Sequence, residues 1–511
     1  MTTYRATLRF GTRTGLLGLR VRYVRKAAIV VACLAGGLSG LDTSVNIAFP
    51  AITAGFDLDP VQIQWVVVSY VLTYATLLLP LGRLADRVGH GRVLVAGLTL
   101  SITGVAACSA APIFRVFLAA RVVQGIGIGL VLAAAPALVT LAVPADRQPR
   151  ALGAFQMSVA LGVAIGPPLG GLLLDLADWR AVFWFRVPVG MVILGFALRL
   201  GLHASTRPRA ERSENTPLDL GGALSLGVAL TGLLVAARWG ANWGWGSSTT
   251  LEVVAVGLVA LTVFVIVESR AAFPLVDLAL FRIPSFALAN GLNLIANATQ
   301  FVLWLLGPYL FVTVRGHGTI LGGLLFSAMS ATAALASAAA GPLTARVGSA
   351  RLSALGLAVQ AVGLAAVSRV GKDTPTLAVA GTLAVVGLGL GLFAVPNLSF
   401  VMGSIPRTQQ GVASGMTQMV RTVGIVAGVA AANSLFDVLR RRESLSTGET
   451  DLGAASVFVP SFQGVALAAA GVCGLAAVLA VSRCRGQRVG VPHDAPRSDP
   501  VPTERPDGAT R

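Results

Sequence analysis

One carboxylate of this sequence lies well inside a long apolar segment. The chain holds 22 Asp and Glu residues, most of them in polar stretches or at segment ends, whereas Asp42 is preceded and followed by apolar residues. A carboxylate near the middle of a bilayer costs about 2.5–3.5 kcal/mol, so it persists where it faces a partner or a cavity. Because a carboxylate can bind and release a proton, Asp42 is predicted to carry a coupled proton. The alternative is a carboxylate that only packs helices through hydroxyl and backbone groups.

Arg121 is the predicted partner of Asp42. Asp42 lies eight residues before Pro50, near the end of one apolar segment, and Arg121 lies nine residues after Pro112, near the start of another. At 1.5 Å per helical residue, both lie roughly 12–14 Å from the same boundary. Protonation of Asp42 would weaken such an ion pair and so could drive a conformational change. An Arg121 that only binds backbone carbonyls is the alternative.

The composition requires lipid as the solvent of this chain. Of the 511 residues, 55% are hydrophobic and 12% are charged, whereas soluble domains carry about 25% charged residues. The formal charge of +17 would suggest a nucleic-acid partner in a soluble protein. Here most basic residues fall in loops and tails, where they orient a protein in the bilayer, so no nucleic acid is expected. No phosphate-binding G-x-x-x-x-G-K-[ST] motif is present, so ATP is not expected either.

Fourteen segments reach the length of about 20 apolar residues that a membrane helix needs, which predicts an all-α polytopic membrane protein. These segments are 27–49, 62–82, 92–111, 114–137, 150–174, 181–201, 218–238, 250–268, 285–312, 319–341, 351–370, 375–400, 410–436 and 461–482.

Basic residues in the loops predict the orientation. The tail 1–26 contains seven Arg and Lys residues, so the positive-inside rule places it in the cytoplasm. An even number of segments returns the C-terminal tail, 486–511, to the same side, and its Pro- and Asp-rich composition predicts disorder. Only Arg440, Arg441 and Arg442 fall in an outer loop and oppose this pattern. We therefore expect a multi-pass protein of the plasma membrane with both termini in the cytoplasm.

A glycine- and arginine-rich stretch follows the second segment and has a weaker copy, Gly341–Gly348, after the tenth. Two such copies imply duplicated halves, here 27–201 and 271–485, each of six helices. The region 202–270 would then be a linker with two additional helices. The characteristic positions of the first copy are Gly82, Arg83, Asp86, Arg87, Gly89 and Arg92.

The stretch from Gly82 to Arg92 resembles the cytoplasmic signature G-x-L-a-D-r-x-G-r-k/r of the major facilitator superfamily. His90 and Gly91 depart from its usual basic positions. The resemblance implies a fold of two six-helix bundles and a loop that latches the two halves on the cytoplasmic side. An ordinary basic cytoplasmic loop is the alternative.

Three further stretches resemble the fourteen-helix drug:proton antiporter branch of that superfamily. They are Leu41–Pro50, with Ser44 at a position where Thr is usual, Arg121–Gly127 and Gly162–Gly171. The third stretch resembles a motif of exporters, which implies a helix that bends and approaches a neighbour closely at the seam between halves. Simple helix packing is the alternative. The residues assigned to this antiporter hinge are Gly162, Gly166, Pro167, Gly170 and Gly171.

Embedded polar side chains are candidates for substrate contact. Asn290, Asn293, Asn297 and Gln300 recur at helical spacing and so share one face. Hydrogen bonds between helices explain such residues equally well. Arg421 is a second embedded base, for which a structural role and contact with a substrate anion are equally supported. The remaining candidates are Asn46, Gln124, Gln156 and Asn397.

Together these features predict a secondary transporter that exports hydrophobic or amphipathic small molecules, such as drugs or antibiotics, by alternating access. Protons would be the coupling ion, with no other cofactor and no metal. Proton-linked uptake of a nutrient is one alternative, although the exporter-type motif argues against it. A membrane sensor or scaffold that does not transport is another. A membrane enzyme is disfavoured, because the sequence shows no catalytic pair or metal cluster.

Overall fold

The computed structural model describes residues 26–144, 147–202, 220–243, 246–270, 278–405, 410–448 and 454–484. Every regular element in these ranges is helical, which agrees with the all-α prediction. The two predicted tails lie outside the described residues, apart from Lys26, and so does 203–219 of the predicted linker.

The first membrane span runs over Lys26–Ile47 and contains a 3₁₀ turn, η1 (Leu41–Thr43), and a short helix, α2 (Ser44–Ile47). The rest of the N-terminal part consists of α3 (Phe49–Gly55), η2 (Pro60–Ile63), α4 (Gln64–Val88), α5 (His90–Ala110), α6 (Phe114–Leu141), α7 (Gln148–Leu176), α8 (Ala181–Trp184) and α9 (Arg186–Arg199). The later elements are α10 (Leu220–Trp243), α11 (Ser248–Arg270), η6 (Leu278–Arg282), α12 (Pro284–Pro308), the π-helical turn η7 (Tyr309–Val314), α13 (Thr319–Val347), α14 (Ser349–Val367), α15 (Thr376–Gly403), α16 (Gln410–Thr447) and α17 (Ala455–Cys484).

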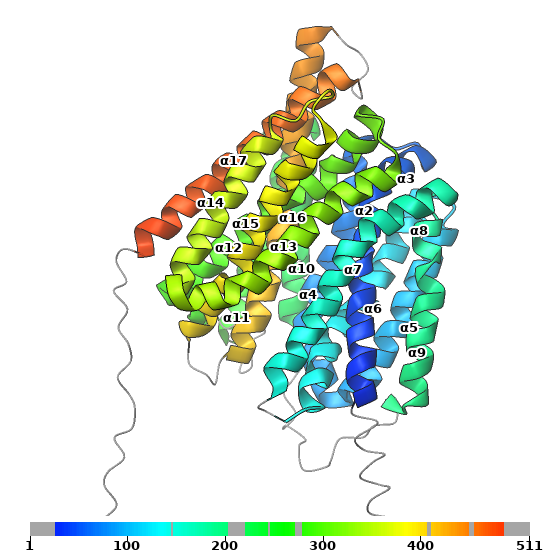
Figure 1. Cartoon of the computed structure of the whole chain (residues 1–511), viewed down its shortest axis with the longest axis vertical. Coiled ribbons are helices and arrows are strands. Elements are labelled where there is room, and N and C mark those ends of the chain that lie inside the picture. The colour runs from blue at the N-terminus through cyan, green and yellow to red at the C-terminus, as the bar shows by residue number, and fades with distance from the viewer. Residues whose placement is uncertain are drawn as a thin grey trace, which may run out of the picture.

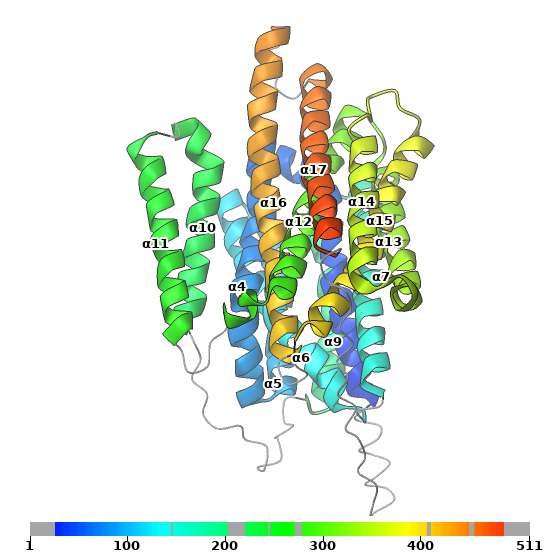
Figure 2. The ribbon, with the colours of Figure 1, turned by 90° about the vertical axis from the view of Figure 1, so that its left-hand side faces the viewer.

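Within the described residues, 12 helices are long and apolar enough to cross a membrane, and 13 qualify if the bent helix α4 is one span. Helix α4 bends by 55° between Leu78 and Pro80, where proline removes a backbone donor. Helix α10 is not among these, and it pairs with α11 at one side of the bundle (Figure 2). The predicted count of fourteen is therefore only approximately supported, although every predicted segment overlaps a described helix.

Several predicted boundaries are wrong, and α16 differs most, since it ends at Thr447 rather than at 436. Arg440 and Arg441 therefore continue a helix instead of occupying a loop. Both pair with Asp437 one turn earlier, at 3.1 Å each, and such pairs stabilise a helix beyond its apolar part. The predicted segment 181–201 agrees with one candidate span, Ala181–Arg199, in which Phe185 separates α8 from α9 while keeping helical backbone angles.

The two copies of the glycine- and arginine-rich stretch have the same backbone geometry. Each is mostly helical, and one glycine alone separates the helices, Gly89 with φ 107° and Gly348 with φ 91°. Glycine adopts such left-handed geometry at little cost. Two close-packed glycines follow each of these turns at the same spacing. They are Gly97 and Gly104 in α5 after Gly89, and Gly356 and Gly363 in α14 after Gly348.

These glycines bring neighbouring helices to backbone contact. A Cβ at Gly104 would lie 2.5 Å from the backbone nitrogen of Gln124 in α6, and a Cβ at Gly356 would lie 2.5 Å from that of Phe393 in α15. Lipid provides no hydrophobic drive for helix association, so such close van der Waals packing has to hold the helices together.

The two halves meet along α7 and α13, which cross in front of the bundle (Figure 1). A Cβ at Gly171 would overlap the carbonyl oxygen of Thr319, and a Cβ at Gly323 would overlap that of Pro167. We call the end of the bundle with Thr319 the upper end, and the end with Gly89 and Gly348 the lower end, as they appear in Figure 1.

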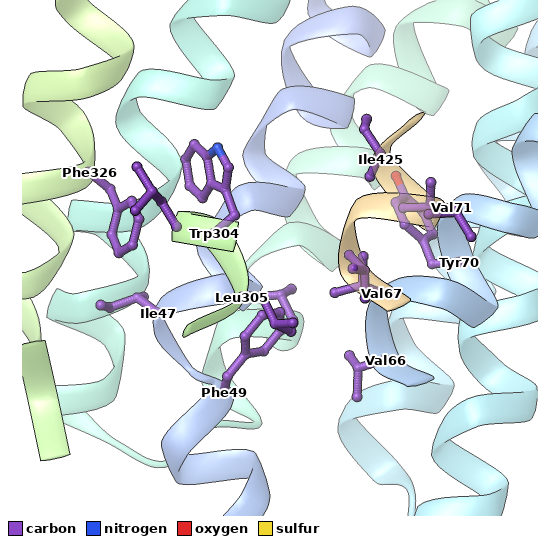
Figure 3. Packing of buried hydrophobic residues seen from close by; sticks show 14 of the residues in the cluster. Ile47, Phe49, Val66, Val67, Tyr70, Val71, Trp304, Leu305, Phe326 and Ile425 are labelled. Carbon is purple, nitrogen blue, oxygen red and sulfur yellow. The ribbon is translucent and has the colours of Figure 1, made fainter. Parts of the chain in front are cut away.

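Apolar side chains fill the seam around the first span (Figure 3). Ile47 and Phe49 lie beside Leu305 of α12, and the rings of Trp304 and Phe326 stack with their centroids 4.9 Å apart. All five side chains are at most 5% exposed, so this part of the seam excludes solvent.

Polar contacts close the upper end. The hydroxyls of Thr53 and Tyr309 lie 2.5 Å apart, and Arg440 of α16 pairs with Asp59 at 3.3 Å. At the lower end, a Cβ at Gly82 or at Gly341 would meet no atom within 4 Å. Gly82 and Gly341 are therefore loosely surrounded, whereas the glycines of the upper seam are tightly packed.

Replacement of Gly356 tests the packing of α14 on α15. Gly356→Val should lower the apparent Tm of the purified protein in detergent, because its side chain would push against the backbone of Phe393, and overpacking costs about 1–3 kcal/mol. Gly381→Val is the control, because a Cβ on that glycine of α15 has no atom within 4 Å. Equal melting curves for both variants would contradict the proposed packing.

Candidate functional site

The backbone around Asp42 is fixed by close contact with α7. The first span tightens into 3₁₀ geometry over Leu41–Thr43, a feature often found at hinges. A Cβ at Gly40 would overlap the carbonyl oxygen of Val159, and the hydroxyl of Thr43 donates to the carbonyl oxygen of Val163 at 3.2 Å. The segment that carries Asp42 therefore rests directly on the backbone of α7.

The carboxylate of Asp42 accepts four hydrogen bonds. Its Oδ1 accepts from Arg121 Nη1 at 3.1 Å, from Gln124 Nε2 at 2.9 Å and from Arg186 Nη1 at 2.5 Å. Its Oδ2 accepts from Arg121 Nη2 at 3.2 Å. An ionised carboxylate offers about two acceptor sites on each oxygen, so Oδ1 is crowded by three donors whereas Oδ2 keeps one site.

Both arginines are held in place by further contacts. Arg121 Nε donates to the carbonyl oxygen of Val66 at 3.1 Å, and its guanidinium lies 4.2 Å from the ring centroid of Tyr70. Arg186 Nε donates to the carbonyl oxygen of Val182 at 3.2 Å. The side chains of both arginines are 3% exposed, and that of Asp42 is 13% exposed. Two cations thus surround one anion, and this cluster of Asp42, Arg121 and Arg186 has a net charge of +1.

The predicted proximity of Asp42 and Arg121 agrees with this geometry, whereas Arg186 was not among the predicted site residues. A signal for Arg186 exists in the sequence, because it is a base inside the predicted apolar segment 181–201. The criterion that singled out Asp42 applies to it equally, since an embedded charge needs a partner.

Gln124 joins the charge cluster instead of standing apart as a substrate contact. Its amide nitrogen donates to Asp42, and its oxygen accepts a bond of 2.7 Å from Arg121 Nη1. The side chain therefore orients both charged groups.

The predicted polar face of α12 forms bonds both within the helix and to its neighbours. Asn293 donates to the carbonyl oxygen of Thr417 in α16, and Asn397 of α15 donates to that of Ala289, at 3.0 and 3.1 Å. Asn297 donates to the carbonyl oxygen of Asn293 at 2.8 Å within α12, and Asn290 is fully buried. The bonds of Asn293 and Asn397 agree with the alternative of interhelical hydrogen bonding. Of the other candidates, Asn46 is buried, Gln300 is half-buried and Gln156 is exposed, and none of them bonds to the charge cluster.

Arg421 is exposed and faces the N-terminal half from α16. Its Nε donates to Asn297 Oδ1 at 3.3 Å. Tyr74 of α4 lies close enough to Arg421, Asp42 and Arg121 to interact electrostatically with all three. Tyr74 therefore stands between the charge cluster and the base of the opposite half.

The glycines of the predicted hinge occupy two faces of α7. Gly162, Gly166 and Gly170 contact the first span, where a Cβ at Gly170 would lie 2.6 Å from the carbonyl oxygen of Ser44. Only Gly171 and Pro167 contact α13 across the seam. The prediction that all five residues lie at the seam is thus wrong for Gly162, Gly166 and Gly170. These three are four residues apart and therefore share one helical face, whereas Gly171 lies about 100° further round the helix than Gly170.

The residues of the predicted cytoplasmic latch lie at the lower end, in the last turns of α4 and the first turn of α5. Asp86 is 60% exposed and lies 3.4 Å from His90 Nε2, whereas Arg83 is half-buried. Arg87 and Arg92 are exposed. Within the described ranges, no group of three His, Cys, Asp or Glu side chains could hold a metal ion.

Stability measurements on charge variants test the cluster. Asp42→Asn leaves two buried guanidinium groups without a counter-charge, and loss of one partner of a buried pair costs about 3–5 kcal/mol. Arg186→Gln leaves a neutral Asp42–Arg121 pair, so its apparent Tm in detergent should fall less. The double variant should melt above Asp42→Asn, because it removes one uncompensated charge. A double variant that melts below both single variants would contradict this balance of charges.

Comparison with known proteins agrees with the family that the motifs resemble. The Major Facilitator Superfamily profile matches residues 31–429. The multidrug resistance protein Stp of Mycobacterium tuberculosis is 32% identical over 76% of this chain and 72% of its own length. The cephamycin export protein CmcT of Amycolatopsis lactamdurans is 32% identical over 92% of this chain and 95% of its own. The riboflavin transporter RibZ of Clostridioides difficile is 26% identical over 89% and 96%.

Solved structures agree at the level of the fold. A bacterial homologue of the human lysosomal transporter Spinster matches with a TM-score of 0.65 at 15% identity, over 90% of this chain and 97% of its own. The profile match extends over most of the described helices, and two relatives at 32% identity are aligned over most of their own length. This chain is therefore a membrane transporter that belongs to the Major Facilitator Superfamily.

Proposed function

We propose that this protein is a proton-coupled exporter of hydrophobic or amphipathic small molecules and that Asp42 carries the proton. The observation that supports this most directly is the carboxylate of Asp42, buried among Arg121, Arg186 and Gln124. A buried carboxylate at this depth is costly and needs a reason to persist, which reversible protonation supplies. Neither ATP nor a further cofactor is required by this proposal.

Protonation would change what the cluster holds together. Ionised Asp42 binds the first span to α6 through Arg121 and to α9 through Arg186. A protonated Asp42 loses its charge and one acceptor site, so both charge-assisted bonds weaken. The first span is then free to shift against α6 and α9, and it carries Ile47 and Phe49 of the seam with it.

The distribution of contacts supports alternating access. The upper end is closed by the α7–α13 contact and by the pairs Thr53–Tyr309 and Asp59–Arg440. The loosely surrounded glycines lie at the lower end, which the basic loops assign to the cytoplasm. We assign this structure to a state accessible from the cytoplasm, the side from which an exporter takes its substrate.

The relatives support export of organic compounds, although they differ in the compounds for which they are named. Two of them are described by multidrug resistance and by cephamycin export. The riboflavin transporter among the relatives supports uptake of a nutrient as the second candidate. Since Asp42 already pairs with two arginines, a substrate cation would have to compete with them for the carboxylate, which favours neutral or anionic compounds over cations.

Transport under an imposed pH gradient tests the coupling. We expect wild-type protein in proteoliposomes to move a fluorescent amphipathic dye against its gradient when protons flow in the opposite direction. Asp42→Asn should abolish this uphill transport, because Asn cannot carry a proton, yet it should keep exchange of dye with dye. Asp178→Asn is the matched control, since that carboxylate is exposed and pairs with Arg180 outside the cluster.

Equal uphill transport by wild type and Asp42→Asn would make Asp42 structural and exclude the proposed coupling. Transport of riboflavin but not of dye, in the direction of the proton flow, would favour the nutrient candidate. Exchange activity in both proteins shows that the variant is folded, so a loss of uphill transport alone reports on coupling.

A seam variant tests alternating access. Gly323→Val should prevent closure at the upper end, because its side chain would overlap the backbone of Pro167. We expect transport to fall at least tenfold while detergent-solubilised protein remains monodisperse. Gly381→Val in α15 should transport normally, since that glycine lies outside the seam and both signature copies and a Cβ there has no atom within 4 Å. Full activity of Gly323→Val would show that the upper seam need not close.

A further inference from the structure

A small cavity lies inside the N-terminal half, next to the charge cluster. Its lining comes from the first span, α4, α5, α6 and α9, and it has room for about one water molecule. Its polar lining consists of Ser39, Asp42, Tyr70, Ser101, Gln124 and Arg186. The cavity differs from the α7–α13 seam, because neither of those helices contributes to its lining.

Arg186 lines this cavity and has an unused donor group. Its Nε binds the carbonyl oxygen of Val182 and its Nη1 binds Asp42, whereas its Nη2 has no hydrogen-bond partner in the described part of the chain. The side chain is only 3% exposed. Buried polar atoms are almost always paired, so two unpaired N–H groups of a buried guanidinium indicate a missing occupant.

The charge of the cluster indicates the sign of that occupant. Arg121 and Arg186 carry two positive charges and Asp42 carries one negative charge, and among the described residues both arginines form ion pairs with Asp42 alone. A water molecule would satisfy the hydrogen bonds of Arg186 but would leave one positive charge uncompensated. An anion satisfies both the donors and the charge.

The size of the cavity limits the anion to one small enough to replace a water molecule. Ser101 and Tyr70 present hydroxyls to the cavity, whereas the hydroxyl of Ser39 donates to the carbonyl oxygen of Gly36 at 2.6 Å. A guanidinium with one or two hydroxyls suits a halide ion. Phosphate, sulfate or an organic acid would need far more space.

We propose that this cavity is a binding site for a small monovalent inorganic anion, such as chloride, held by Arg186 Nη2 with Ser101 and Tyr70. The site is a property of the resting protein, so it can be tested without transport.

The anion and the proton should bind cooperatively. The charged and titratable groups that face Asp42 are Arg121 from α6, Arg186 from α9, Tyr70 and Tyr74 from α4, and Cys108 from α5. Protonation of Asp42 raises the net charge of the cluster from +1 to +2, which strengthens its attraction for an anion. By linkage, the bound anion favours protonation by the same factor.

Halide titration of the purified full-length protein tests the site. The apparent Tm is measured while sodium chloride or bromide replaces sodium gluconate at constant ionic strength, since gluconate is too large for the cavity. We expect a saturable rise in Tm for wild type, with a midpoint at lower halide concentration as the pH falls. Arg186→Gln and Ser101→Val, which fills the cavity without a change of charge, should raise the midpoint at least tenfold. Arg180→Gln is the control, because Arg180 lies outside the cavity lining.

Each other outcome overturns the proposal. A linear, unsaturable rise in wild type would indicate a general salt effect and a cavity filled by water. A saturable rise that is identical in wild type, Arg186→Gln and Ser101→Val would place the halide elsewhere. Crystals soaked in bromide give a direct check, because the anomalous signal should lie beside Arg186, and a peak only at other positions would also exclude this site.

Discussion

A buried carboxylate bound by two guanidinium groups is the constraint on which the N-terminal half depends. In a low-dielectric interior, one unpaired member of such a cluster would be very costly, so three helices must converge at one point. The first span brings Asp42, α6 brings Arg121 with Gln124, and α9 brings Arg186. Helix α4 contributes the carbonyl oxygen of Val66 and the ring of Tyr70, which complete the surroundings of Arg121.

Glycine fixes the position of the span that carries Asp42. Gly40 and Gly162 bring the first span and α7 into backbone contact, closer than larger side chains would allow. The same device recurs in both halves, where Gly104 meets α6 and Gly356 meets α15. Membrane helices gain little from burial of apolar surface against one another, so small residues and a few polar bonds have to specify their positions.

The sequence predicts how deep a residue lies in the membrane, but it does not predict which neighbour a helical face contacts. Hydropathy located the helices, and counting residues from Pro50 and Pro112 placed Asp42 and Arg121 at one level. The search for apolar segments predicted an end of α16 that is too early, because ion pairs such as Asp437–Arg440 extend the helix beyond its apolar residues. Helix rotation is not encoded in hydropathy, so the division of the α7 glycines between two neighbours and the role of Asn293 as a connector emerged only from the structure.

The position of α7 has an evolutionary consequence. One face of this helix lies against the first span at Gly162, Gly166 and Gly170, and the next face lies against α13 at Gly171. Any larger residue at these positions would require a simultaneous change in a neighbouring backbone, which single mutations cannot supply. Amino-acid substitutions in α7 should therefore accumulate at the positions that no neighbouring helix covers. Those positions can adapt to a new lipid environment while the two packed faces stay constant. The large exposed residues on that side are Met157, Leu161, Ile165, Leu172 and Leu176.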